Sequence, residues 1–104
     1  SLTLPFMSVG AVGVVSVASN IIPKQVSDLV KLALKNDFAG ALKLHRQYYP
    51  LLSAFLKLAT NPIPIKTAMA LAGHVGPELR LPLVPMDAAK TNELETTLKQ
   101  LGII

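Results

Sequence analysis

The sequence predicts an α/β chain that is mostly helical, with one buried strand followed by four helices. A run of valines over residues 11–18, bounded by Gly10 and by Ser19-Asn20, is typical of a strand buried on both faces. Such strands belong to parallel sheets covered by helices. A strand that feeds a covering helix indicates the closing unit of an α/β sheet or barrel, and later helices without strands indicate an appended helical domain.

The first 35 residues carry the closing unit. Residues 1–10 favour the tail of a helix, because Pro5 is tolerated in a first helical turn and Gly10 suits a helix end. The strand is expected at about 11–18, and a helix at about 23–35 opens with Pro23 at its first position. Its apolar face is predicted to comprise Val26, Leu29, Val30, Ala33 and Leu34.

The second predicted helix runs from Phe38 through Leu58. Asn36 suits the left-handed position that ends the preceding helix, and Asp37 can cap the new one. Pro50 lies inside it and is expected to kink it. We expect a buried face made of Phe38, Ala41, Leu42, Tyr49, Leu52, Phe55 and Leu56.

Two further helices complete the appended domain. Asn61 is expected to cap the third, with Pro62 at its first position and Gly73 at its end. Residues 74–86 contain three prolines, which predicts an extended, irregular connection. Asp87 is expected to cap the last helix, residues 88–101, whose apolar face comprises Thr91, Leu94, Leu98 and Leu101.

Composition excludes several classes of function. The chain has no cysteine, which excludes disulfide scaffolds, thiolate metal sites and a cysteine nucleophile, and its two histidines are too few for a typical structural zinc site. The net charge of +4 comes from basic residues spread between Lys24 and Lys99 without a run, which disfavours nucleic-acid binding. The longest weakly polar stretch, residues 9–18, is too short to span a membrane.

The chain is unusually apolar for its size. Apolar residues make up 51% of it and charged residues only 15%, against about 25% charged in an average globular domain. A small domain needs polar residues to cover its large relative surface. We therefore expect a buried partner surface, and the lone predicted strand suggests a piece cut from a larger core.

Three segments carry a resemblance to a known family. VGAVGVVSVASN at 9–20, NPIPIK at 61–66 and LRLPLVPM at 79–86 occur in an order and spacing similar to the C-terminal third of the dihydrodipicolinate synthase family of pyruvate-dependent class I aldolases. The resemblance implies a (β/α)8 barrel followed by a helical domain. Residues 1–35 would then end the barrel, and residues 36–104 would form the C-terminal helical domain.

The same resemblance implies an activity. A barrel lysine would form a Schiff base with pyruvate, and the enamine would condense with aspartate semialdehyde in lysine and diaminopimelate biosynthesis. No catalytic residue of that family falls in this chain. Val15 matches the residue whose backbone carbonyl lines the pyruvate site, and Ser16 and Asn20 would lie at the pocket edge. The implied enzyme is a cytoplasmic homo-oligomer, tetrameric or dimeric, without cofactor or metal, and the chain's immediate partner is the rest of the barrel.

Several chemistry-bearing residues have simpler interpretations. Lys66 is a tempting nucleophile, but it falls on a predicted helix outside the barrel, where a solvated or carboxylate-paired lysine is expected. Tyr48 and Tyr49 have the helical spacing of packing residues, and His45 and His74 are expected at the surface or with satisfied hydrogen bonds. The side chains of Ser16, Ser19 and Asn20 could bond to the pocket or cap the loop, and these alternatives remain open.

Two other functions fit the sequence. One is a non-catalytic helical module that docks through its apolar face. The other is the same fragment of a sibling aldolase that acts on sialic acid or a keto-deoxy sugar acid. On the leading interpretation, the fragment alone is inactive.

Overall fold

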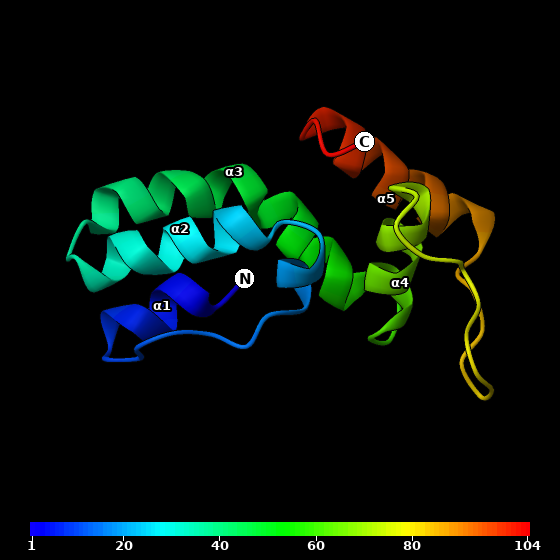
Figure 1. The fold of residues 1–104 in the computed structure, drawn as a ribbon, viewed down its shortest axis with the longest axis horizontal. Helices are drawn as coiled ribbons and strands as arrows, with labels where there is room; N and C mark the ends of the chain where they lie inside the picture. Colours follow the sequence, from blue (N-terminus) through cyan, green and yellow to red (C-terminus); the bar gives the residue numbers. More distant parts are fainter. The chain divides into compact units, whose positions relative to one another are not determined.

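The computed structural model describes residues 1–104, which form two compact units, Ser1–Pro50 and Leu51–Ile104. The chain contains five α-helices, labelled in Figure 1, and one short 3-10 helix, η1. The elements are α1 (Thr3–Ser8), η1 (Val17–Asn20), α2 (Pro23–Leu34), α3 (Phe38–Lys57), α4 (Ile63–Leu71) and α5 (Ala88–Gln100). Each predicted helix is therefore present, with its ends within about two residues of the expected bounds. α3 belongs to the first unit up to Pro50 and to the second from Leu51.

The strand predicted at about 11–18 is wrong for this chain, which contains no strand. Residues 11–16 run without regular structure between α1 and η1 (Figure 1), and Val17 and Ala18 already belong to the 3-10 helix. The physical reason is that a strand pairs its backbone groups with a neighbouring strand, and this sequence supplies no second one.

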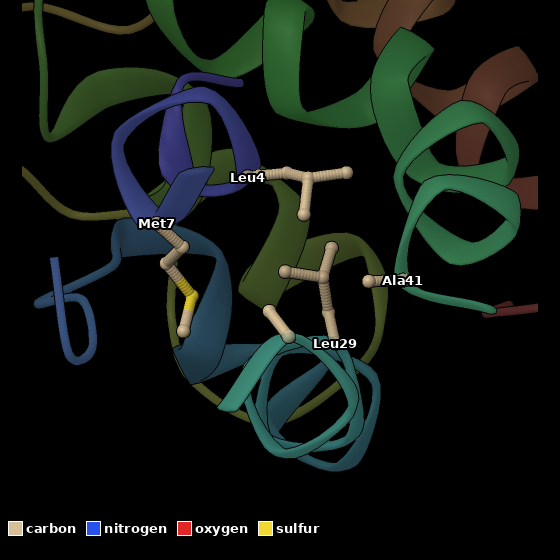
Figure 2. Close-up of a cluster of buried hydrophobic side chains, with 5 residues drawn as sticks. Leu4, Met7, Leu29 and Ala41 are labelled. Atoms are coloured by element: carbon tan, nitrogen blue, oxygen red, sulfur yellow. The ribbon is translucent and has the colours of Figure 1, made fainter. Parts of the chain in front are cut away.

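The core of the first unit joins its three α-helices. Leu4 and Met7 of α1 meet Leu29 and Ala33 of α2 and Ala41 of α3, and each of these residues is at most 7% exposed. Figure 2 shows Leu4, Met7 and Leu29 converging beside Ala41. Contacts between α1 and α2 therefore hold the start of the chain against residues 23–34.

Local signals in the first unit act as predicted. Pro23 opens α2 at its first position, and Asn36 has the left-handed backbone expected after a helix, with a φ of 61°. The backbone N–H of Gly40 donates to Oδ1 of Asp37 over 2.9 Å, which caps α3. These features depend on residues that are adjacent in sequence, so they form without help from elsewhere in the fold.

The second unit contains α4 and α5, which contact each other, and an irregular connection over residues 74–86 (Figure 1). Gly73 ends α4 with a φ of 75°, and the N–H of His74 donates to the carbonyl of Met69 over 2.9 Å. Leu94 and Leu98 of α5 are fully buried, as predicted. None of the helices combines the length and apolar character that a bilayer span requires.

Three details of the predicted helices are wrong. Asn61 does not cap α4, because the helix begins at Ile63 and Pro62 occupies the cap position with non-helical angles. On α3, Leu42, Tyr49 and Leu56 are exposed, and Leu51 is fully buried where Leu52 was expected. Leu34 of α2 was predicted on the apolar face of its helix but is 54% exposed. Each of these helices carries apolar residues on more than one face, so the spacing of apolar residues alone does not show which face is buried.

The cap of α5 leads to a testable expectation. Oδ1 of Asp87 accepts the N–H of Lys90 over 2.9 Å, and the Lys90 ammonium lies 3.4 Å from Oδ2. This hydrogen bond, with the nearby ammonium, lowers the pKa of Asp87. We expect Asp87→Ala to speed amide hydrogen exchange at Lys90 several-fold, while Asp87→Asn keeps the acceptor and most of the protection.

The pH dependence of this cap follows from the sign of the shift. The folded-state pKa of Asp87 lies below the ordinary aspartate pKa. The ionised carboxylate therefore contributes its full stabilisation to the helix at pH values above that ordinary pKa. That contribution disappears as the pH falls through the lowered pKa. Equal exchange rates at Lys90 in the alanine and asparagine variants at neutral pH would show that the side-chain cap is unimportant.

Candidate functional site

The residues predicted to reach the pyruvate site lie just before η1. Val15 has a fully exposed side chain, and residues 12–15 make no hydrogen bond to the rest of the first unit. Ser16 is half-buried and has extended backbone angles, with a φ of −123° and a ψ of 129°. The backbone of Val15 is therefore free to contact another part of a larger protein.

The polar side chains after Val15 bond within the turn. Oγ of Ser19 donates to the carbonyl of Ser16 over 2.5 Å, and the Ser19 N–H approaches the same carbonyl at 3.2 Å. Nδ2 of Asn20 donates to the carbonyl of Val17 over 2.9 Å. Ser19 and Asn20 thus make the contacts of loop caps, which is one of the two alternatives that the sequence left open, and bonding to the pocket stays a prediction.

The turn is anchored to α2 by buried residues. Ala18 and Ile22 are each only 2% exposed, and the N–H of Ile22 donates to the carbonyl of Ala18 over 2.9 Å. The carbonyl of Ile22 then accepts the N–H of Val26 in the first turn of α2. A continuous series of hydrogen bonds thus connects the residues after Val15 with a stable helix.

A groove of about 370 Å³ lies between the extended segment and α2. Its lining consists of Gly13, Val14, Ser19, Pro23, Val26, Ser27, Val30 and Lys31. Of the predicted site residues only Ser19 borders it, whereas Val15, Ser16 and Asn20 do not. Ser27 and Lys31 were not predicted to line a groove, although these polar residues at i and i+4 lie beside Val26 and Val30 on the same helix.

The other chemistry-bearing residues do not assemble into a catalytic group. Lys66 is half-buried on α4, and no ion pair among residues 51–104 includes it. The ring of Tyr49 lies 5.5 Å from the His45 ring in a tilted arrangement. His74 is exposed. No three histidine, aspartate or glutamate side chains gather as metal ligands would.

His45 differs from expectation. Its Nδ1 atom is buried and has no hydrogen-bond partner, where a surface or satisfied histidine was predicted. Burial is the main cause that lowers the pKa of His45. Burial therefore favours the neutral form of the ring.

The absence of an assembled lysine site predicts a chemical outcome. A Schiff-base lysine needs burial or a neighbouring cation that favours its neutral amine. We expect that treatment of the 104-residue chain with pyruvate and borohydride leaves every lysine unmodified, as measured by mass spectrometry. A pyruvyl adduct on Lys66, at a level above that on the exposed Lys57, would contradict this expectation.

Comparisons with known proteins point to one family. Residues 1–101 match the Dihydrodipicolinate synthetase family. The 4-hydroxy-tetrahydrodipicolinate synthase of Methanosarcina acetivorans is 50% identical over 103 residues, which are 99% of this chain and 35% of that protein. The chain thus spans about a third of the length of the curated relatives it matches.

Solved structures agree with this match. The 4-hydroxy-tetrahydrodipicolinate synthase of Methylacidiphilum fumariolicum SolV superposes with a TM-score of 0.94 at 50% identity, over 97% of this chain and 33% of that one. A dihydrodipicolinate synthase from Acinetobacter baumannii, solved in complex with pyruvate, superposes with a TM-score of 0.92 at 34% identity, over 97% and 34% of the two chains.

Proposed function

This chain belongs to the dihydrodipicolinate synthetase family, and we propose that it forms the C-terminal third of a 4-hydroxy-tetrahydrodipicolinate synthase. The observation that carries the proposal is the 50% identity to the Methanosarcina acetivorans enzyme over 99% of the chain. The structural match to a synthase solved with pyruvate supports pyruvate as a substrate.

The proposed reaction joins two small molecules through a lysine of the larger protein. The lysine amine condenses with the keto carbon of pyruvate, releases water and forms an iminium ion. Loss of a proton from the methyl carbon gives an enamine, and this carbon attacks the aldehyde of aspartate semialdehyde. We propose that this enzyme acts in the biosynthesis of lysine and diaminopimelate and that it is a cytoplasmic homo-oligomer.

Within this enzyme, residues 1–35 close a (β/α)8 barrel and residues 36–104 form its helical domain. Residues 11–16 pair their backbone with neighbouring barrel strands, and Val12, Val14 and Val15, whose side chains are exposed in the chain by itself, pack against the rest of the barrel. Val15 contributes its backbone carbonyl to the pyruvate site, at the strand end where such barrels place their chemistry. Ser16 and Asn20 lie at the edge of that pocket.

A chimeric enzyme tests the proposal. In the Methanosarcina acetivorans synthase, residues 1–104 of this chain replace the matching third. We expect the chimera to form a borohydride-trapped pyruvyl adduct and to condense pyruvate with aspartate semialdehyde at a rate within about tenfold of the parent. The matched control is the parent enzyme with the same third deleted. A folded chimera that traps no pyruvate would refute the proposal.

A further inference from the structure

We propose that Ser19 and Asn20 are positioning residues for pyruvate: their side chains fix the turn after Val15 and thereby orient the Val15 carbonyl. This inference rests on the proposed function, because it concerns the same pyruvate site. In this proposal the two side chains act on pyruvate indirectly, through the orientation of the Val15 carbonyl.

The geometry connects the two side chains to Val15 through Ser16. The carbonyl of Ser16 accepts both the Oγ–H and the N–H of Ser19, at 2.5 and 3.2 Å. These two bonds fix the peptide that follows Ser16, and the peptide that precedes Ser16 carries the Val15 carbonyl. Only the φ and ψ angles of Ser16 separate the fixed peptide from that carbonyl, so a change in the turn rotates it directly.

Asn20 secures the next peptide in the same way. Its Nδ2 donates to the carbonyl of Val17 over 2.9 Å, so the carbonyls of Ser16 and Val17 are both held by side chains. The turn rests on Ala18 and Ile22, which are almost fully buried. Residues 12–15 make no hydrogen bond to the rest of the first unit, so this turn restrains the Val15 carbonyl from its C-terminal side.

The hydrogen-bond inventory favours positioning over direct contact with substrate. A serine hydroxyl has one proton, and that of Ser19 is given to the Ser16 carbonyl. Asn20 has committed one of its amide protons to Val17. The Ser19 proton and one Asn20 amide proton are thus committed to the backbone beside the site, which supports a role in positioning that backbone.

The chimera described above allows a test with matched variants. Ser19→Ala removes the hydroxyl, and Ser19→Thr restores it. Asn20→Ala removes the amide donor. Ser8→Ala is the control, because Oγ of Ser8 donates over 2.6 Å to the carbonyl of Pro5, three residues earlier, and so makes the same kind of exposed bond at another site.

We expect Ser19→Ala and Asn20→Ala to raise the KM for pyruvate about tenfold, with kcat and the KM for aspartate semialdehyde changed less than about threefold. Ser19→Thr should return the KM for pyruvate close to the parental value, and Ser8→Ala should leave it unchanged. If Ser19→Ala and Asn20→Ala keep the parental KM for pyruvate, or if Ser19→Thr fails to restore it, the inference is overturned.

A measurement without catalysis separates this inference from the proposed function. In the 104-residue chain, the carbonyl ¹³C resonance of Val15 should shift in Ser19→Ala and stay in place in Ser8→Ala. An unmoved resonance in Ser19→Ala refutes the coupling between Ser19 and Val15, whatever the chimera does. An inactive parental chimera with the expected resonance shift refutes the proposed function and the pyruvate role, and leaves the coupling itself supported.

Discussion

Val15→Pro in the chimeric synthase is expected to lower kcat/KM by about 100-fold or more, whereas Val15→Ile leaves it within about threefold of the parent. Proline removes the amide donor of residue 15 and restricts Val14 before it. In the proposed barrel that amide belongs to a parallel ladder, so its loss moves the strand end and the carbonyl beside it. Isoleucine keeps the backbone and adds one methylene group.

Steady-state kinetics on the two variants measure this difference, with circular dichroism as a control for folding. The comparison is informative because the Val15 side chain is fully exposed and makes no part of the first unit's core. A loss of activity therefore does not arise from a cavity in that core. A folded Val15→Pro chimera with parental kcat/KM would show that residue 15 does not line the pyruvate site.

Leu29→Ala is expected to lower the free energy of unfolding of the 104-residue chain by about 2–5 kcal/mol. Leu29 is 6% exposed and lies in the cluster with Leu4 and Met7 (Figure 2). Removal of its branched end leaves a cavity between α1 and α2. The midpoint of urea denaturation, followed by circular dichroism, measures the loss.

Leu34→Ala is the matched control for this prediction. The substitution is the same, the residue lies on the same helix, and leucine and alanine have similar helix propensities. Leu34 is 54% exposed, so we expect a change below about 1 kcal/mol. Equal losses for the two variants would mean that the cluster around Leu29 is not the core of the first unit.

The sequence predicted the features that depend on neighbouring residues. Pro23 and Asp87 mark helix starts, and Asn36 and Gly73 mark helix ends, because each acts on backbone groups only a few residues away. The family resemblance was also visible in short segments such as NPIPIK at 61–66, and the match over residues 1–101 confirms it.

Features that depend on distant partners were harder to predict. The valine-rich segment has the composition of a strand but lacks the strands that would complete its ladder, so it stays unpaired here. On α3, Leu51 and Leu52 are equally apolar neighbours, and only the three-dimensional packing decides which of them is buried. The hydrogen bonds of Ser19 and Asn20 depend on the 3-10 helix at residues 17–20. The predicted strand overlapped the start of that helix, so these bonds were not expected.

The packing of both α1 and η1 on α2 has a further consequence for residues 9–16, which connect them. A free chain loses about 1–2 kcal/mol of backbone conformational entropy for each residue that becomes fixed. Because both ends of this segment are held on α2, it explores far fewer conformations than a free peptide does, even without a neighbouring strand. If residues 9–16 join a barrel sheet as proposed, they should therefore dock on it more strongly than the same residues offered as a free peptide.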